Sequence, residues 1–576
     1  MDRQSSGRSR LFGRIDNRTE ICDYLGLDPS IEDGVLYDFA LDRWGDDTDG
    51  RLVGHYCVIT VLGPGRLRLV RSPWTAPPLH FVAEGGRIIA SPILSVIFAG
   101  GHPREVDYNY LRDQLAFDHH DCESSGWYRG ISRVPIGCRA HCSPSGFELE
   151  RYYDPTAISP VRLANDDQYV ERAAELIQEA AAVALAGSTK AGIMISGGLD
   201  SPIIAAACLN CSGPSATLEG YTAGTVSHWD GRVPSGTFGD ERERVRRFAC
   251  QHPRLKLNFP DPNKGGHDYR LRELLGVTET PTANVANIGI FHGLFEAAAK
   301  DGCDRLMNAM LGNFSFSLDG HWAAASHLRN GNWRKLAAVL RRPLATDKRP
   351  WLRRFLAQAL LPNLPSAWQR HIRSAAHPDR FGFALPASPL SRSAIESWRA
   401  DRTDQSVFEQ PSLDSSQADA IRRMWASADS GEDLDLGLER LHGIQLRDVT
   451  AYRPLIEFCQ GLPVEQLRRG GVDRYLARRL ARGIMPEAQR LEQRQGRHNP
   501  DWHARIGSRR KELSERLENI SMHPQLGGMI DTEMLKGHLD DWGEHTPTEP
   551  AQLWPRYFAL TRALTAATFV SRRTTK

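Results

Sequence analysis

Residues 191–202 read AGIMISGGLDSP, an apolar run followed by a serine, two glycines, a leucine, an aspartate and a second serine. The apolar run has the length of a buried strand, and the residues from Asp200 onward suit the first turn of a helix. Glycines between a strand and a helix let the backbone approach phosphate closely, while loop amides and the helix N-terminus supply positive potential. The stretch therefore predicts a strand, a phosphate-binding loop and a helix, in that order.

The predicted loop offers a phosphate several kinds of group, from six residues: Ser196, Gly197, Gly198, Leu199, Asp200 and Ser201. The serine hydroxyls can donate hydrogen bonds, and the Asp200 carboxylate would hold a Mg²⁺ ion that bridges phosphates. Neither the pattern Gly-x4-Gly-Lys-Ser/Thr nor the dinucleotide pattern Gly-x-Gly-x-x-Gly fits these residues. The alternative interpretation is a glycine-rich connection that Asp200 merely caps.

Predicted strands and helices alternate around this loop. A helical pattern covers residues 168–186, the strand covers 191–195, and a further helix covers 202–209. Such alternation is typical of a parallel, doubly wound α/β sheet. Residues 1–160 are instead β-rich, with short segments at 52–62, 66–71, 79–83 and 87–91 separated by Gly or Pro turns. We expect a β-sandwich domain over 1–160 and an α/β domain with helical additions over 161–576.

The composition of the 576-residue chain is that of an ordinary globular enzyme, with 41% hydrophobic and 25% charged residues. The formal net charge of +2 argues against bulk nucleic-acid binding. The Arg-rich start is not followed by an apolar run, and no stretch of about 18 apolar residues occurs, so we expect no membrane span. Ten cysteines are too sparse for a disulfide framework. These features predict a cytoplasmic protein.

The six residues Ser-Gly-Gly-Leu-Asp-Ser at 196–201 resemble the pyrophosphate-loop motif of the asparagine synthetase superfamily. In that superfamily a glutaminase-like domain precedes a synthetase domain that cleaves ATP to AMP and pyrophosphate. The resemblance implies a degenerate Ntn-glutaminase-like β-sandwich followed by an ATP-pyrophosphatase domain of the adenine nucleotide α-hydrolase-like type. It implies ATP and Mg²⁺ as cofactors. Tyr221 and Thr222, at the predicted end of the next strand, could then contact adenine through backbone groups.

The N-terminal half is similar to the glutaminase part of this superfamily, with Arg71-Ser72-Pro73 resembling one of its loops. A working glutaminase of this type carries Cys directly after the initiator Met, as nucleophile and as base through its own amine. Here the second residue is Asp2 and the first cysteine is Cys22. We therefore expect glutamine hydrolysis to be lost and another amine to be the acceptor.

Within the superfamily, the chain most resembles the cyclases that close the isopeptide ring of lasso peptides. Their Gly-Asn-x-Thr/Ser-x-Ser segment is similar to residues 312–317, and their Arg-Asp-Pro-Thr-Ala and Leu-Val-Glu-Phe-Cys segments are similar to 447–451 and 455–459. Residues 471–474 and 477–479 continue the match. β-Lactam synthetases place a catalytic Tyr where this chain has Met310, which counts against that branch.

This resemblance implies further site residues. Asn313 replaces the second carboxylate of the family and would bind Mg²⁺ weakly or through water, with Asp319 as the alternative source of charge. Arg494 lies two residues before Gly496, near the position of a catalytic Lys in β-lactam synthetases, and could stabilise charge on the reacting oxygens. A solvated arginine remains open, because Arg497 nearby makes the alignment uncertain.

The implied reaction is ATP-dependent macrolactam formation on a precursor (core) peptide, with a leader protease and a leader-binding protein as partners and with neither nucleic acid nor membrane. Two alternatives stay open. One is a β-lactam or asparagine-type synthetase that acts on a small amino acid, and the other is a non-catalytic peptide-binding subunit. A basic stretch at 341–373 could dock a partner or form solvated helix faces. Ring size, and Asp or Glu as the acceptor residue, stay undefined.

Overall fold

The structure is a computed structural model of the whole chain. It describes residues 7–116, 126–281, 285–342, 344, 347–376, 387–401, 412–429 and 431–572. Asp2 lies outside the described residues, so the expectation placed on it stays a prediction.

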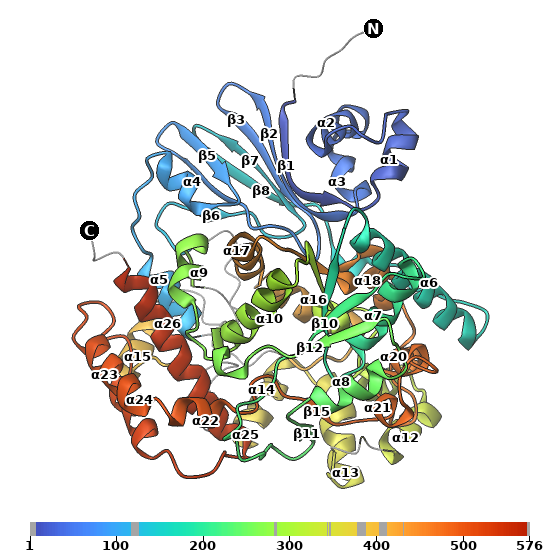
Figure 1. Cartoon of the computed structure of the whole chain (residues 1–576), viewed down its shortest axis with the longest axis vertical. Coiled ribbons are helices and arrows are strands. Elements are labelled where there is room, and N and C mark those ends of the chain that lie inside the picture. Colours follow the sequence, from blue (N-terminus) through green and yellow to red (C-terminus); the bar gives the residue numbers. More distant parts are fainter. Residues whose placement is uncertain are drawn as a thin grey trace.

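The N-terminal part is built from two antiparallel sheets (Figure 1). The larger has the order β1 (Ser9–Ile15), β2 (Gly54–Gly63), β3 (Arg66–Arg71), β7 (Cys138–Ser143), β8 (Gly146–Arg151). The smaller has the order β5 (Arg87–Ser91), β4 (His80–Glu84), β6 (Ser132–Arg133). Phe81 on β4 packs edge-on against Phe147 on β8, with ring centroids 4.8 Å apart, so the sheets face each other. The four segments predicted as strands are β2 to β5.

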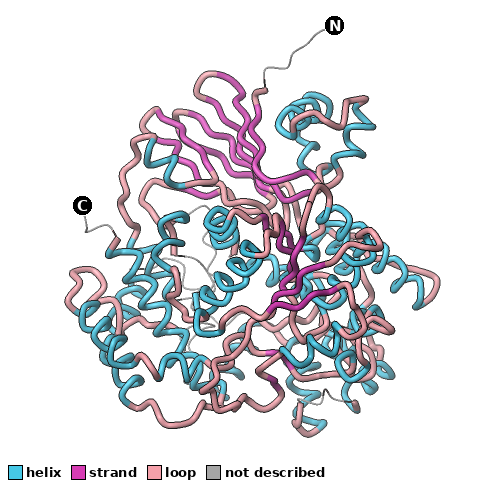
Figure 2. Tube along the Cα trace, in the orientation of Figure 1, coloured by secondary structure: helices cyan, strands magenta, loops and turns pink. Residues whose placement is uncertain are grey.

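The second part contains a five-stranded parallel sheet in the order β12 (Leu255–Asn258), β10 (Leu218–Tyr221), β9 (Ala191–Met194), β13 (Arg305–Asn308), β14 (Gln445–Asp448). The chain runs outward from β9 first to one side and later to the other. Such a reversal of strand order leaves a crevice at the carboxyl ends of the strands, where ligands of open α/β sheets bind. Figure 2 shows these strands at the centre of the molecule, below the N-terminal sheets.

Helices cover both faces of the parallel sheet. Leu306 of β13 packs in the apolar cluster that includes helix α10 (Ile288–Lys300), whereas its neighbour Met307 packs with α6 (Asp166–Leu185) and α7 (Asp200–Cys211). Successive strand residues point to opposite faces, so each face has its own core. The predicted helix 168–186, strand 191–195 and helix 202–209 are thereby confirmed as α6, β9 and α7.

The remaining elements are mostly helices. In the N-terminal part they are α1 (Arg18–Leu25), α2 (Asp33–Trp44), α3 (Thr48–Arg51), α4 (Leu94–Ala99) and α5 (Tyr108–Ala116). In the second part they are α8 (Arg242–Ala249), α9 (Leu271–Thr278), α11 (Ala323–Arg329), α12 (Trp333–Arg341), α13 (Trp351–Arg354), α14 (Ser366–Ala376), α15 (Arg392–Asp401), α16 (Gln417–Ala428), α17 (Glu432–His442), α18 (Arg453–Gln460), α19 (Val464–Leu467), α20 (Tyr475–Leu480), α21 (Glu487–Arg490), α22 (Trp502–Gly507), α23 (Arg510–Ser521), α24 (Thr532–Asp540), α25 (Pro550–Leu553) and α26 (Leu560–Ser571). Two short strands, β11 (Thr237–Phe238) and β15 (Gln495–Gly496), pair in parallel.

One buried ion pair ties the two parts together. The guanidinium of Arg71 donates to both carboxylate oxygens of Asp429, at 2.8 and 2.7 Å, and also to the carbonyls of Ala76, Pro77 and Val134. Both partners of the ion pair are almost fully buried. Asp429 lies between α16 and α17, so its two hydrogen bonds with Arg71 connect the second part to the N-terminal sheets, while the three carbonyls hold Arg71 within the N-terminal part.

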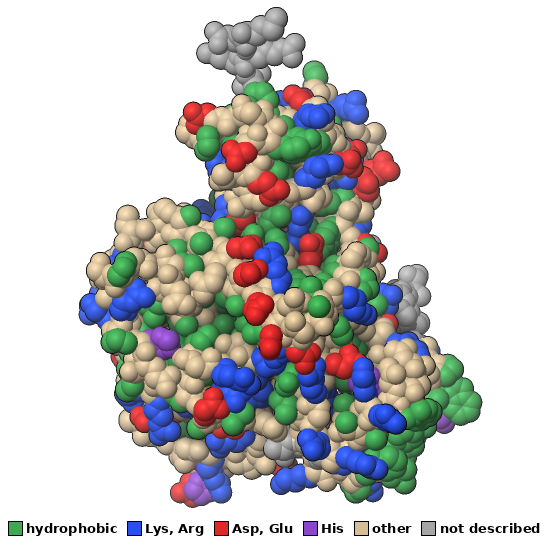
Figure 3. Space-filling view, turned by 90° about the vertical axis from the view of Figure 1, so that its right-hand side faces the viewer, with side chains coloured by type: hydrophobic (Ala, Val, Ile, Leu, Met, Phe, Trp, Pro, Cys, Tyr) green, Lys and Arg blue, Asp and Glu red, His purple; other side chains and the backbone are tan. Residues whose placement is uncertain are grey.

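The basic stretch 341–373 forms part of a helical layer that exposes large apolar side chains. Trp333, Trp351, Leu352 and Trp368 are among the most exposed of them. In the space-filling view, hydrophobic side chains gather at the lower right edge of the molecule with Lys and Arg nearby (Figure 3). Within the described part of the chain, no helix is long and apolar enough to cross a membrane.

Candidate functional site

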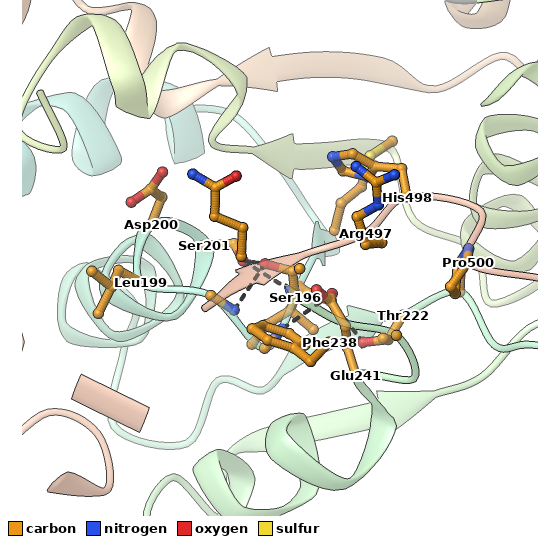
Figure 4. Close-up of a pocket in the computed structure, with 18 of the residues that line it drawn as sticks. Ser196, Leu199, Asp200, Ser201, Thr222, Phe238, Glu241, Arg497, His498 and Pro500 are labelled. Carbon is orange, nitrogen blue, oxygen red and sulfur yellow. Dashed lines mark hydrogen bonds between the residues drawn. The ribbon is translucent and has the colours of Figure 1, made fainter. Parts of the chain in front are cut away.

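A cavity of about 580 Å³ opens at the carboxyl ends of β9, β10 and β13 (Figure 4). The loop 196–201, which follows β9, forms one wall, and the segment 492–501, between α21 and α22, forms another. Asn313 follows β13 and also lines the cavity. The crevice that the strand order predicts therefore exists, and the glycine loop lies in it.

The loop is held open by its own serines. The hydroxyl of Ser201 accepts the Ser196 N–H at 2.9 Å and lies 3.1 Å from the Ser196 hydroxyl, which in turn accepts the Gly198 N–H at 3.3 Å. Helix α7 begins at Asp200, so the N–H groups of its first turn lie beside the cavity. A Cβ atom at Gly197 would lie 2.8 Å from the Arg244 side chain, which explains the glycine there.

A glutamine from a distant part of the chain fixes the outer side of the loop. The side-chain amide of Gln489, on α21, donates to the carbonyls of Gly197 at 3.3 Å and Gly198 at 3.0 Å. Gln489 is buried. These hydrogen bonds satisfy the two carbonyls and fix the backbone of the loop. The sequence analysis missed Gln489, since nothing local marks it.

Asp200 lies in a narrow space between the loop and the segment after β13. The Ser317 hydroxyl donates to its carboxylate at 2.5 Å. A Cβ atom at Gly312 would lie 2.7 Å from the same carboxylate, so only glycine fits there. Burial raises the pKa of Asp200, while Arg474 and the Ser317 hydrogen bond act in the opposite direction. A half-buried carboxylate without a bonded cation suits a Mg²⁺ ion that is also held by phosphates.

The two candidates for the second metal ligand lie in different places. Asn313 lines the cavity. Asp319 is not among the lining residues, and its carboxylate instead binds the Nδ1 atom of His321 at 2.7 Å. Among the described residues no cluster of three or more His, Cys, Asp or Glu side chains could hold a metal by itself. Asp200 and Asn313 would therefore need phosphate oxygens or water to complete a Mg²⁺ site.

Arg494 lines the cavity, but its charge is already matched. Its guanidinium binds both carboxylate oxygens of Glu492, at 3.0 and 2.6 Å, and about half of its side chain is exposed to solvent. Glu492 also accepts from Arg244 at 2.6 Å. These hydrogen bonds, with that of Arg494 the strongest, lower the pKa of Glu492 to about 2. Arg494 thus forms part of an ion-pair cluster at the cavity wall.

Arg497 is a different kind of cation. It lines the same cavity, and its guanidinium has no hydrogen-bond or ion-pair partner among the residues that the structure describes. Burial lowers its pKa, although the group stays charged. Figure 4 places Arg497 and His498 across the cavity from Asp200. An unpaired, half-buried guanidinium is a ready partner for an anion.

Tyr221 and Thr222 take different parts in the site. The Tyr221 ring is buried, and its hydroxyl donates to Asp301 at 2.9 Å, so the side chain is engaged elsewhere. The Thr222 hydroxyl donates to the Ile195 carbonyl at 2.7 Å at the start of the glycine loop. Both residues line the cavity, where their backbone groups remain the part that could contact a base.

Glu241 extends from the start of α8 to the glycine loop. Its carboxylate accepts the Gly197 N–H at 3.3 Å, and a Cβ atom at Gly496 would lie only 2.1 Å from it. Burial raises the pKa of Glu241 to about 7, against the opposing effects of the Gly197 N–H and Arg244. In the sequence, Gly239-Asp240-Glu241-Arg242 resembles a segment of the asparagine synthetase superfamily, which leaves two roles open for Asp240 and Glu241: facing the nucleotide or capping the next helix. Glu241 lines the cavity.

Several segments that are far apart in the sequence meet around this cavity. The Leu311 N–H donates to Asp448 at 2.8 Å, and the side-chain amide of Gln460 donates to the Phe314 carbonyl at 3.1 Å. Arg478 donates to the carbonyl of Glu492 at 2.9 Å. The segments 311–317, 447–460 and 473–478 therefore support one site.

A family model described as asparagine synthase matches residues 172–567 of the chain. Curated proteins named "Putative asparagine synthetase (glutamine-hydrolyzing)", from Mycobacterium bovis and Mycobacterium tuberculosis, are 26% identical to it over 183 residues. That alignment covers 30% of the chain and 28% of each relative.

Proposed function

Because the chain belongs to the asparagine synthase family, we propose that it is an ATP-dependent carbon–nitrogen ligase that activates a carboxylate and joins it to an amine. The observation that carries this proposal is the glycine loop between β9 and α7, which lies at the switch of strand order and lines a cavity. Its amides and the start of α7 present positive potential where a polyphosphate would bind. Mg²⁺, held by Asp200 and assisted by Asn313, would neutralise phosphate charge.

The chemistry is an adenylation followed by aminolysis. A carboxylate oxygen attacks the α-phosphorus of ATP, the bond to the bridging oxygen breaks, and pyrophosphate leaves. The amine nitrogen then attacks the acyl carbon, the bond to the AMP oxygen breaks, and the nitrogen loses a proton. The amides at 196–198 and the head of α7 bind the pyrophosphate. Arg497, for whose guanidinium the described part of the chain offers no hydrogen-bond or ion-pair partner, would stabilise charge on the phosphate or acyl oxygens.

For the substrate, we propose that the carboxylate is an Asp or Glu side chain of a precursor peptide and that the amine is the N-terminus of the same peptide. The product is a macrolactam of the lasso type. Support comes from the resemblance at 312–317, 447–451 and 455–459. Asn313 of the first segment lines the cavity, and Asp448 of the second accepts the neighbouring Leu311 N–H. Binding both reacting ends of one peptide in the cavity would offset much of the entropic cost of ring closure.

The partners follow from that substrate. We propose a cytoplasmic enzyme that receives its peptide from a leader protease and a leader-binding protein, without nucleic acid or membrane. The alternative is an asparagine-type or β-lactam-forming synthetase on a small amino acid, which the names of the relatives favour. A non-catalytic peptide-binding subunit would not require the phosphate-binding features of the loop.

The test is a direct assay of both halves of the reaction. The protein is incubated with ATP, Mg²⁺ and candidate peptides, while AMP release and the loss of one water from the peptide are measured. Release of AMP together with a cyclised peptide is the expected result. Consumption of free aspartate, with peptides left unchanged, would instead establish the small-molecule alternative.

The variant Asp200→Ala tests the role of the loop in the same assay. The variant should lose at least about 100-fold in AMP release, because removing a charge-stabilising group from a reaction centre costs about that factor. Its thermal midpoint should stay close to that of the parent protein, since burial already disfavours the Asp200 charge. Unchanged AMP release would refute the role assigned to Asp200.

A further inference from the structure

The glycine loop already holds one anion of its own. The Gly197 N–H, which lies where a phosphate oxygen would bind, donates to the Glu241 carboxylate at 3.3 Å. The other loop amides at 196 and 198 donate to serine hydroxyls, which are neutral. Glu241 is therefore the charged group among the acceptors that occupy these amides. Figure 4 shows its side chain reaching the loop from below.

Glu241 has little room to move away from the loop as a whole. On one side, a Cβ atom at Gly496 would lie 2.1 Å from its carboxylate, so the group fits against the bare backbone of β15. On the other side, the Arg244 side chain packs against Gly197. The carboxyl is thus fixed next to the place where a polyphosphate carrying several negative charges would bind.

The charged groups around Glu241 are engaged with other partners. Arg244, on the same helix, binds Glu492 at 2.6 Å. Asp240 binds Arg242 at 3.0 Å. Across the cavity wall, Arg494 is paired with Glu492, and Arg497 has no direct contact with Glu241. No cation is therefore hydrogen-bonded to Glu241 in the described part of the chain, and the nearby Arg244, which is already paired with Glu492, offsets its negative charge only in part.

We propose that phosphate displaces the Glu241 carboxylate from the Gly197 amide and that Glu241 takes up a proton as nucleotide binds. The neutral carboxyl group then can donate a hydrogen bond to a phosphate oxygen instead of repelling it. Glu241 would be a positioning residue that makes nucleotide affinity depend on pH. This inference rests on the proposed function, because it assumes that the loop binds a nucleotide.

The sign of the pH effect follows from the two states. In the empty site, burial holds the pKa of Glu241 at about 7. A neighbouring polyphosphate raises the pKa further, so the bound state keeps the proton. Above pH 7 binding must take up that proton, and affinity falls as pH rises. The dissociation constant should increase about fivefold between pH 7 and pH 8, as expected for one coupled proton.

The experiment measures binding alone and needs no peptide. Isothermal titration with the α,β-methylene analogue of ATP and Mg²⁺, at pH 8 in two buffers of different ionisation enthalpy, gives the number of protons taken up. We expect about one proton per nucleotide for the parent protein and none for Glu241→Gln. Glu241→Gln should also bind more tightly at pH 8 and lose its pH dependence between pH 7 and 8.

Glu243→Gln is the matched control. Glu243 lies on the same helix, is exposed, and pairs with Arg247 outside the cavity, so it loses the same charge without touching the loop. It should keep the proton uptake of the parent protein. Proton uptake that persists in Glu241→Gln, or that is absent from the parent protein, would overturn the inference. The measurement of proton uptake by the parent protein decides the question even if Glu241→Gln does not fold.

The outcome separates this inference from the proposed function. If the analogue does not bind at all at any pH, the proposed function fails. If it binds with the same pH dependence in Glu241→Gln as in the parent protein, only the role of Glu241 fails.

Discussion

At the scale of single residues, two arginines three positions apart have opposite surroundings. Arg494 is paired with Glu492 and is half exposed, whereas Arg497 lines the same cavity and its guanidinium has no hydrogen-bond or ion-pair partner among the residues that the structure describes. A guanidinium that is already paired with a carboxylate gains less binding energy from a further anion than an unpaired guanidinium does. The structure therefore favours Arg497 over Arg494, which the sequence selected, as the candidate for stabilising charge in the cavity.

This difference predicts unequal losses. Arg497→Ala should reduce the rate of AMP formation about 100-fold or more, as expected when a donor to a developing negative charge is removed. Arg494→Ala should reduce it by less than about tenfold, since Glu492 would still be held by Arg244. Single-turnover kinetics with saturating ATP and Mg²⁺ compare the two variants. A larger loss in Arg494→Ala would restore the assignment made from the sequence.

At the scale of elements, the glycine loop depends on the short helix α21. The side chain of Gln489, on α21, donates to two loop carbonyls and so holds α21 against the loop. Because these carbonyls are held, the loop backbone is ordered before any ligand arrives, which lowers the entropic cost of binding.

Gln489→Ala should therefore weaken nucleotide binding and destabilise the protein. Leaving two carbonyls without their donor costs about 1–3 kcal/mol, which thermal unfolding would show as a lower midpoint. The KM for ATP should rise more than kcat falls, because the change affects the preformed loop rather than the reacting atoms. Gln495→Ala is the control, since that residue also lines the cavity and its side chain makes no hydrogen bond to these carbonyls among the described residues. Equal effects in the two variants would contradict the role of Gln489.

At the scale of the whole molecule, the Arg71–Asp429 pair joins the two parts of the chain. The pair is buried, and the three carbonyls that also bind Arg71 complete its hydrogen bonding. Removing one partner would leave an uncompensated buried charge. The N-terminal sheets thus act here as a support for the helices that carry Asp429.

Asp429→Ala should cost about 3–5 kcal/mol of unfolding free energy, the usual loss when one half of a buried pair is removed. The double variant Arg71→Met/Asp429→Leu should recover part of this loss, because Arg71 no longer leaves an unpaired charge, whereas Arg133, which pairs with Asp429 at 3.0 Å, still loses its carboxylate. Urea unfolding of the two variants and the parent protein tests the comparison. If the double variant were as unstable as the single one, the hydrogen bonds of Arg71 to the carbonyls, rather than the ion pair, would carry the joint.

The sequence by itself determined the local parts of this protein. The strand, loop and helix at 191–211 follow from an apolar run, adjacent glycines and an acidic residue within a few positions, so no distant contact is needed to predict them. The β-rich start and the alternating pattern after residue 165 likewise predict antiparallel sheets and a parallel sheet. Short-range periodicity carries this information because it reports which face of each element is buried.

Only the tertiary structure decided which side chains share the cavity. Gln489 and Glu241 reach the same glycine from positions far apart in the chain. Gln489 carries no local signal, and the sequence around Glu241 leaves open whether it faces the nucleotide or caps a helix. Arg494 and Arg497 look alike in sequence, but one meets a carboxylate and the other does not. Charge pairing and burial arise from contacts between distant segments. The surroundings of each group at the loop therefore depend on the tertiary structure and cannot be predicted from the local sequence.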